Sequence, residues 1–509
     1  MKKTKKMVAS ILLAGSMLFA CACDPKEEVD LKLSQAPDYS KYTHKFDPYA
    51  YDSMFDGKYT IDEEVFDVGE DFRTLERLQE YRDAGLTTLM PQRSIDLYVD
   101  ITAENWPERE VYMDYAQQAG LKVLLMDGRL RSLSKSKNLI GEDTAEIDYY
   151  YSSQEELDAY VMECVQYYKD HPAFYGLVLA DEPTYDMAES YGIMYKTIRR
   201  LLPDCYIQWN LFPVNTSLDV TNRFPPLDYE FEGTEEERKY EEYRAYLELF
   251  LDATGMEHLC YDDYPIGPNG IDSVYLRGLQ IASEVCKERG IDLHLVAQTF
   301  GMYQNGQLRY PIVTKEDLYW QNNVLLGFGV KEIHYYTYWT GAENETSGEM
   351  RIDGGSWLTY AGEKTYIYDT MKEILAQNQQ FANVIKQFNY QGVRYYVKLP
   401  CIFKISHLYD LDNSYTLKKV TDVSIDKEAA LVTELYDSEN DNYLYMVMNV
   451  LSGNDKGSVA YQTNTITFSN EYTHVVVYKD GVGTPQKLEE GNKLTVELEA
   501  GQAVYLLPY

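Results

Sequence analysis

The sequence predicts an α/β fold, a (β/α)8 TIM barrel followed by an all-β sandwich. A unit made of an amphipathic helix, a glycine and an apolar strand recurs through the middle of the chain. The apolar run 174–180 stops abruptly at Asp181-Glu182-Pro183, and beyond about residue 390 short strands replace the helices. Alternating helices and strands favour a parallel sheet covered by helices, and their number here favours closure into a barrel.

The barrel elements are expected in a regular order. The apolar runs predicted as strands are residues 86–90, 121–126, 174–180, 205–209, 258–261, 293–297 and 333–336. The amphipathic segments predicted as helices are residues 72–81, 112–119, 157–168, 187–202, 240–253, 274–289, 315–326 and 366–385. A first strand is expected between Tyr42 and Thr60. Glycines at positions 85, 120, 255, 290 and 329 follow helices and supply left-handed C-terminal caps. An open doubly wound sheet is the alternative, but it would need fewer strands or a second domain.

The barrel is expected to span residues 42–390 and the sandwich residues 391–509. In the second region short apolar runs recur at 431–436, 443–448, 465–468, 473–478 and 503–507. Turn residues such as those at 452–455 separate these runs. The pattern is typical of an all-β sandwich, and it carries no obvious chemistry of its own.

The N-terminus predicts a lipoprotein signal peptide over residues 1–20 and a tether over residues 21–41. Four lysines among the first six residues precede an apolar stretch that is too short to span a bilayer. Leu18-Phe19-Ala20-Cys21 resembles the bacterial lipobox, in which the cysteine is lipidated and becomes the mature N-terminus. We therefore expect a lipid anchor at Cys21 and a place on the bacterial cell surface. An ordinary signal peptide cut near Ala20 or Ala22, and lipidation at Cys23, are the alternatives.

The net charge of −35 argues against a nucleic-acid partner, because like charges repel. The simpler interpretation of this acidity is that it keeps an exported protein soluble. The five cysteines that follow Cys23 are scattered and lie mostly in apolar runs, as small buried hydrophobes do. The cysteines and histidines lack metal-ligand spacing, and there is no glycine-rich phosphate loop. No metal and no organic cofactor is expected.

Acids, amides and aromatic residues stand where the predicted strands end, which is where such barrels keep their chemistry. These strand-end residues are Gln92, Asp127, Asp181, Glu182, Asn210, Asp262, Asp263, Tyr264, Gln298, Tyr338 and Trp339. One carboxyl group can protonate a leaving oxygen, a second can act as nucleophile or base, and rings can pack against sugar faces. The set is therefore typical of glycoside hydrolysis. For any single acid the alternative is a loop carboxylate that caps the next helix, a role open to Asp181.

The barrel region resembles glycoside hydrolases of the large (β/α)8 clan that includes the family 42 β-galactosidases. In that clan the acid/base glutamate ends strand four, commonly in an Asn-Glu-Pro setting, and the nucleophile glutamate ends strand seven. Glu182 matches the first position, with Asp181 in place of the asparagine. Gln298 stands at the second position, and a glutamine cannot act as the nucleophile. The resemblance therefore implies a role for Glu182 alone, as general acid/base.

Strand six offers a substitute for the missing carboxylate. The segment 261–265 is similar to the Tyr-Asp element on strand six of family 18 chitinase-like hydrolases, which use the substrate's acetamido group as nucleophile. Asp262 and Asp263 point to opposite faces if both lie in a strand, and Asp262 is the favoured second catalytic carboxylate. The residues expected to bind sugar are Asp127, Asp181, Asn210, Asp263, Tyr264, Gln298 and Trp339. Trp339 either forms the floor under a sugar ring or packs under a loop.

The sequence therefore predicts a cell-surface glycoside hydrolase that cleaves O-glycosidic bonds of an extracellular oligo- or polysaccharide. Its expected partners are a carbohydrate substrate and, through the lipid anchor only, the membrane. A non-catalytic glycan-binding lipoprotein on the same fold is the alternative, because fold does not fix function. A third interpretation is a surface protein whose barrel only mediates protein contacts. An acid across the pocket, within about 5–10 Å of Glu182, would favour hydrolysis.

Overall fold

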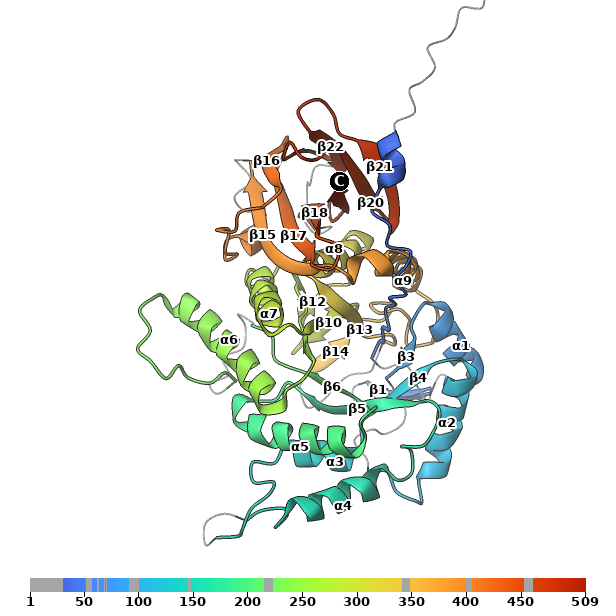
Figure 1. Ribbon diagram of the computed structural model, residues 1–509. Helices are drawn as coiled ribbons and strands as arrows, with labels where there is room; N and C mark the ends of the chain where they lie inside the picture. Colours follow the sequence, from blue (N-terminus) through green and yellow to red (C-terminus); the bar gives the residue numbers. More distant parts are fainter. Residues whose placement is uncertain are drawn as a thin grey trace, which may run out of the picture.

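The computed structural model describes residues 31–51, 57–61, 64–67, 69, 71–90, 100–144, 148–214, 223–340, 348–398, 405–452 and 461–509. A parallel α/β barrel forms the lower part of the molecule in Figure 1, and an antiparallel β domain, from β15 to β23, lies above it. The predicted fold class is confirmed.

Among the described residues, seven parallel strands and one short segment close the barrel. The strands are β3 (Thr88–Leu89), β4 (Lys122–Leu125), β5 (Phe174–Asp181), β6 (Tyr206–Asn210), β7 (His258–Asp262), β10 (Asp292–Gln298) and β13 (Val330–Tyr336). They pair in the orders β3-β4-β5-β6 and β13-β10-β7, and a bridge between Leu211 and Tyr261 joins the two sheets. Ala50 bridges to Tyr335, and the Thr88 N–H donates to the Pro48 carbonyl at 3.2 Å. The segment 48–51 therefore fills the first strand position, inside the expected window.

The helices cover the outside of the barrel (Figure 1). They are α1 (Leu75–Asp83), α2 (Trp106–Gln118), α3 (Gly128–Ser134), α4 (Gln154–Val165), α5 (Ala188–Leu201), α6 (Glu235–Thr254), α7 (Tyr275–Arg289), α8 (Lys315–Gly327) and α9 (Tyr366–Ile385), with short 3₁₀ turns η1 (Leu31–Gln35), η2 (Tyr185–Met187) and η3 (Ser406–Leu408). The five predicted capping glycines all have a positive φ, for example +72° at Gly255 and +66° at Gly290. Among the described helices, none is long and apolar enough to cross a bilayer.

Side chains of alternate strand residues fill the barrel in layers. The lowest layer contains His258, His294 and His334, and the rings of the first two lie 4.6 Å apart. Burial lowers the pKa of all three histidines, to about 4 for His258, so they are neutral at neutral pH. Because successive residues of a strand alternate, every second residue above this layer also points inward. On β7 this places Asp262 at the top of the barrel interior, four residues after His258.

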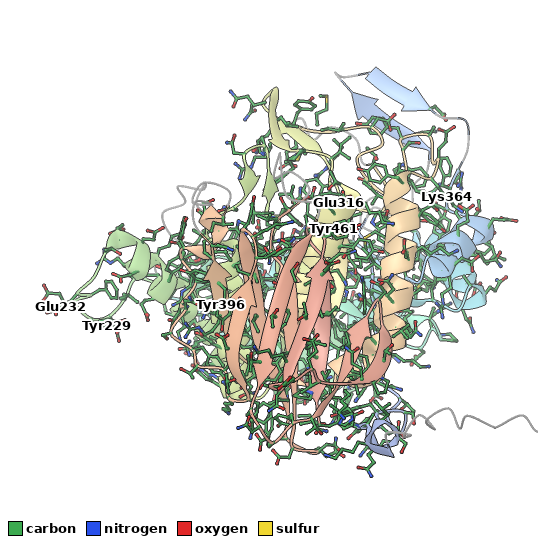
Figure 2. The ribbon with its side chains drawn as sticks, turned by 90° about the horizontal axis from the view of Figure 1, so that it is seen from above. Tyr229, Glu232, Glu316, Lys364, Tyr396 and Tyr461 are labelled. Atoms are coloured by element: carbon green, nitrogen blue, oxygen red, sulfur yellow. The ribbon has the colours of Figure 1, made fainter. Side chains whose placement is uncertain are left out.

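The described strands of the β domain form two antiparallel sheets. One has the order β15-β17-β18-β23-β20-β21, and the other has the order β16-β19-β22. The strands are β15 (Asn389–Val397), β16 (Val420–Ile425), β17 (Ala429–Asp437), β18 (Asn442–Asn449), β19 (Gln462–Phe468), β20 (His474–Lys479), β21 (Val482–Lys487), β22 (Lys493–Leu498) and β23 (Ala503–Pro508). Val432, Val447, Ile466 and Leu506 belong to the buried cluster of this domain. Figure 2 shows the larger sheet from above, with α9 beside it.

The β domain is attached to the barrel and to the first described residues. The Trp320 indole on α8 donates to the Val450 carbonyl at 2.7 Å. Residues 31–42 run along the domain before they enter the barrel (Figure 1), and the Tyr39 hydroxyl donates to Asp437 at 3.0 Å. On the other side of the molecule the segment before α6 projects outward, with Tyr229 and Glu232 at its tip (Figure 2).

We expect Gly176→Ala to destabilise the barrel strongly. A Cβ at Gly176 on β5 would lie 1.9 Å from the Tyr206 carbonyl oxygen on β6, and a strand backbone cannot move aside. The free energy of unfolding should fall by about 3 kcal/mol or more, as for severe overpacking. Urea unfolding measures this effect. Gly267→Ala is the control, because its nearest heavy atom would be 3.4 Å away. Equal unfolding midpoints for the two variants would contradict the close approach of β5 and β6.

Candidate active site

A cavity of about 270 Å³ lies at the carboxyl ends of the barrel strands. Its lining residues are Tyr51, Asp181, Glu182, Asn210, Pro213, Asp262, Asp263, Tyr264, Phe300, Met302, Gln304, Arg309, Tyr310, Tyr336, Glu349 and Arg351. The predicted site residues that it brings together are Asp181, Glu182, Asn210, Asp262, Asp263 and Tyr264. Acids from two strand ends and an amide from a third therefore share one cavity, which is the arrangement that the strand-end pattern predicts.

Glu182 is held in the cavity by an unusual backbone conformation. Its φ of +49° lies in the left-handed region, which non-glycine residues seldom adopt. The Glu182 N–H donates to the Asn210 carbonyl at 2.8 Å, so the chain still follows β6 after β5 has ended. Pro183 has no N–H and stops further pairing. Strain of this kind persists where the surroundings fix it, and it gathers at functional sites.

The surroundings of Glu182 favour its protonated form. Burial, followed by repulsion from Asp181, raises the pKa of the Glu182 carboxyl to about 7, and Glu349 adds to the rise. Arg223 acts in the opposite direction. Burial also raises the pKa of Asp181, while Arg131 and a hydrogen bond from Asn210 lower it. Glu182 is therefore poised to hold and release a proton near neutral pH.

Asp262 and Asp263 both line the cavity. Strand alternation would send only one of them there, but β7 ends at Asp262, so alternation does not extend to the next residue. Burial raises the pKa of both carboxyls well above its usual range. For Asp262 the next cause is repulsion from Glu182 and Asp181, whereas for Asp263 it is Asp272. Asp262 is therefore the acid most strongly linked to Glu182.

Polar atoms of the cavity acids remain available to a ligand. Among the described residues, Asp262 Oδ1 and Asp263 Oδ2 have no hydrogen-bond partner although they are buried. Asn210, by contrast, is fixed from two sides: Gln208 donates to its Oδ1 at 3.1 Å, and its Nδ2 donates to the Tyr51 hydroxyl and, at 3.5 Å, to Asp181. A buried acceptor without a partner is costly, so the two aspartates suit a ligand that donates hydrogen bonds.

A small antiparallel sheet forms a wall of the cavity that the sequence analysis missed. It has the order β12-β11-β14, with β11 at Met302–Gln304, β12 at Gln307–Tyr310 and β14 at Glu349–Arg351. A second hairpin, β8 (Ile266–Gly267) with β9 (Gly270–Ile271), follows β7. Arg309, Glu349 and Arg351 reach the cavity from the wall. The turn Asn305-Gly306, with φ of +51° and +73°, is the sequence signal that could have revealed the first hairpin.

Asp127 and Trp339 lie outside the cavity. Asp127 Oδ1 accepts the Arg129 N–H at 3.0 Å and so caps α3, and its Oδ2 pairs with the Arg129 guanidinium at 2.8 Å. The Tyr168 hydroxyl also donates to Asp127 at 3.1 Å. Trp339 is 3% exposed, and its ring centroid lies 4.4 Å from that of Phe72. Asp127 thus caps α3 and Trp339 packs against Phe72, so neither side chain lines this cavity.

Gln298 is not among the residues that line the cavity. It accepts the Ile266 N–H at 2.9 Å and donates to the Ile266 carbonyl at 3.2 Å. These bonds hold the chain that follows Asp262, Asp263 and Tyr264. Gln298 therefore supports the segment that carries the acids. Cys21 and the predicted signal peptide lie outside the described residues.

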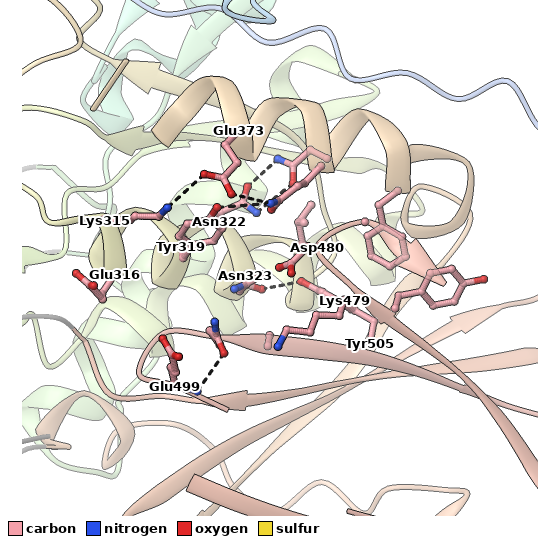
Figure 3. A pocket seen from close by; sticks show the side chains of 18 of the residues that line it. Lys315, Glu316, Tyr319, Asn322, Asn323, Glu373, Lys479, Asp480, Glu499 and Tyr505 are labelled. Carbon is pink, nitrogen blue, oxygen red and sulfur yellow. Dashed lines mark hydrogen bonds and ion pairs between the residues drawn. The ribbon is translucent and has the colours of Figure 1, made fainter. Parts of the chain in front are cut away.

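A second cavity of about 270 Å³ lies between α8, α9 and the β domain (Figure 3). Its polar groups bond to one another: Lys315 pairs with Glu373 at 3.3 Å, and Asn322 exchanges bonds of 3.1 and 2.7 Å with Asn378. It shares no lining residue with the strand-end cavity. In the part of the chain that the structure describes, no cluster of three or more His, Cys, Asp or Glu is arranged to hold a metal ion.

The similarity of this chain to known proteins is low. No protein-family model and no curated protein matches the sequence. A family 5 glycoside hydrolase from Bacteroides vulgatus is 9% identical, with a TM-score of 0.49 over 91% of this chain and 89% of that one. An endo-β-1,4-mannanase from Thermotoga petrophila is 11% identical, with a TM-score of 0.39 over 91% and 99%. A β-galactosidase from Marinomonas ef1 is 11% identical, with a TM-score of 0.39 over 62% and 58%.

These likenesses are to glycoside hydrolases at low identity. With TM-scores below 0.5, they carry no weight for the activity of this chain. The resemblance to the clan of the family 42 β-galactosidases stays a prediction.

Proposed function

We propose that this protein is a glycoside hydrolase that cleaves O-glycosidic bonds of an extracellular oligo- or polysaccharide, with Glu182 as general acid/base. One observation carries the proposal: Glu182 directly follows a barrel strand and lines a cavity, with a pKa raised to about 7 and other acids beside it. A carboxyl group that is protonated near neutral pH can donate to a leaving oxygen, which an ordinary surface glutamate cannot do.

In the proposed reaction Glu182 gives its proton to the glycosidic oxygen as the C1–O bond breaks, and the bonding electrons leave with that oxygen. Asp262 is the second carboxylate. It opposes the positive charge that develops on the sugar ring and accepts the proton of the water that attacks C1. Burial and, after it, repulsion from Glu182 raise the pKa of Asp262. Protonation of Glu182 removes the second cause and so favours the ionised form of Asp262, and one proton shared between the two acids suits both roles. Asn210 keeps Asp181 oriented beside them.

The test of the proposal is product release by the full chain from a panel of aryl glycosides and of plant and host polysaccharides. A reducing-end or aryl product from at least one substrate supports a hydrolase. Glycan binding without any product would favour the second candidate, a non-catalytic glycan-binding protein. One observation favours that candidate: Gln298, at the strand-seven position, is engaged with the Ile266 backbone and cannot be a nucleophile.

We expect activity to fall as the pH rises through about 7. The Glu182 pKa is raised above the usual value of a glutamate, so its acid form persists to near neutral pH and is lost above it. On the alkaline side kcat/KM should decline about tenfold per pH unit, as for a single required proton. Initial rates between pH 5 and 9 measure the profile. A rate that stays level to pH 9 would contradict the acid role.

We also propose where the protein is located in the cell. We propose that the chain is lipidated at Cys21 and held at the bacterial cell surface, which rests on the lipobox-like pattern of residues 18–21. A glycan outside the cell is the substrate that such a place offers.

A further inference from the structure

Arg351 is held rigidly in the wall of the cavity. It is the last residue of β14 and is 5% exposed. Its guanidinium carbon lies 4.5 Å from the ring centroid of Phe300 and 4.8 Å from that of Tyr336. Its Nη2 donates to the Tyr336 hydroxyl at 2.8 Å. Two aromatic contacts and one hydrogen bond therefore fix the plane of the guanidinium.

The other end of this guanidinium has no partner. Within the described ranges, the buried Nη1 of Arg351 makes no hydrogen bond. Glu349, two residues earlier on the same strand, also lines the cavity, yet no ion pair joins the two side chains. An arginine stays charged at every physiological pH, and a buried charge with an unused donor is costly. A cationic donor that stays open in a ligand-sized cavity suits an anionic group of the ligand.

We propose that Arg351 binds an oxyanion substituent of the sugar, a carboxylate or a sulfate ester, so that the substrate is an acidic glycan. The inference rests on the proposed function, because it names the substrate class of the same cavity. Arginine matches planar and tetrahedral oxyanions better than other side chains do. Arg309 on β12 brings a second positive charge to the same wall. A chain of net charge −35 needs such a local cationic wall to accept an acidic sugar.

The cavity is divided between two kinds of group. The acids Asp181, Glu182 and Asp262 stand at the strand ends, whereas both arginines, Arg309 and Arg351, come with Glu349 from the small sheet that follows them. An acidic sugar fits this division, because its hydroxyl groups can donate to the carboxylates while its oxyanion faces the arginines. A neutral sugar can offer the Arg351 Nη1 only an uncharged hydroxyl oxygen, which accepts a weaker hydrogen bond than an oxyanion does.

The test measures binding by calorimetry, with the full chain carrying Glu182→Gln so that turnover does not interfere. The probes are polygalacturonate, alginate, glucuronoxylan and hyaluronan, each beside its carboxyl-reduced form, and carrageenan and chondroitin sulfate, each beside its desulfated form. We expect at least one acidic glycan to bind about tenfold or more tightly than its neutralised form. Weaker binding after carboxyl reduction identifies a uronate as the bound group, and weaker binding after desulfation identifies a sulfate ester.

Adding Arg351→Gln should remove the preference by weakening binding of the acidic form far more than binding of the neutral form, and Arg351→Lys should keep part of the preference because the charge remains. Thermal unfolding of each variant checks the fold. Equal binding of acidic and neutral forms would overturn the inference. An equal loss for both forms in Arg351→Gln would also overturn it, because it would reduce Arg351 to a support for Tyr336.

The outcomes separate the two proposals. Binding of an acidic glycan through Arg351, without its hydrolysis by the unsubstituted chain, would retain the inference and reject the hydrolase. Hydrolysis of neutral glycans at rates that Arg351→Gln does not alter would retain the hydrolase and reject the inference.

Discussion

Glu182→Gln is expected to lower kcat on an unactivated glycan by about 10³-fold, within the range that general acid catalysis contributes. The amide keeps the size and shape of the carboxyl group but cannot donate a proton to the leaving oxygen. Binding should persist, because glutamine can still donate and accept hydrogen bonds, so KM should change little. Initial rates of the wild type and the variant on the same glycan measure both quantities.

Glu349→Gln is the matched control, because it makes the same chemical change at another glutamate of the same cavity. Glu349 acts on Glu182 only as the smallest of the three causes that raise its pKa, so its loss should affect kcat far less. A full loss in Glu349→Gln together with normal rates in Glu182→Gln would assign the acid to β14 and contradict the role of Glu182.

Asp262→Asn is expected to lower kcat by about 10² to 10⁴-fold, because asparagine can neither oppose the charge on the ring nor accept a proton. The control is Asp263→Asn, which alters the next residue of the same chain segment. Asp263 is as buried as Asp262, but its strongest charged neighbour is Asp272 and not Glu182, so its loss should cost much less activity. Steady-state rates of the two variants on one substrate make the comparison.

Stability provides a folding check on both aspartate variants. The pKa of each of these carboxyls is higher in the folded state than in the unfolded state. Such a carboxyl stabilises the folded state at acid pH, and this stabilisation is lost as the pH rises through the pKa of the folded state. Replacing either aspartate by the neutral amide should therefore raise the unfolding midpoint relative to the wild type more at pH 8 than at pH 5.

If Asp263→Asn loses more activity than Asp262→Asn, the second carboxylate is Asp263.

The sequence predicts the repeated part of the fold and misses its irregular parts. Each of the seven apolar runs overlaps a barrel strand, because a strand buried on both faces needs a continuous apolar sequence. The first strand position had no such signal: segment 48–51 joins β13 through few bonds, such as Tyr51 N–H to Tyr335 O at 2.9 Å. Helix α3 was missed because it is short and depends on the Asp127 cap and not on a long apolar face.

The sequence predicted which strand ends carry the candidate site, but it did not predict which of their side chains point into the cavity. The strand ends placed Glu182 and Asp262 at one edge of the barrel, because parallel strands end on the same side. Whether a strand-end residue reaches the cavity depends on its local partners, which sequence spacing does not specify. Asp127 turns to Arg129, and Gln298 turns to the Ile266 backbone. Arg351 comes from a short strand far from any predicted strand end, so its place appears only in three dimensions.

The most direct test of the central claim, that Glu182 is the general acid, compares leaving groups. Dinitrophenyl glycosides need no protonation of the leaving oxygen, whereas alkyl glycosides and natural glycans do. The account predicts that Glu182→Gln cleaves the dinitrophenyl glycoside of a preferred sugar at a rate within about tenfold of the wild type and loses about 10³-fold on the natural glycan. Equal losses on both substrates, or none on either, would contradict it.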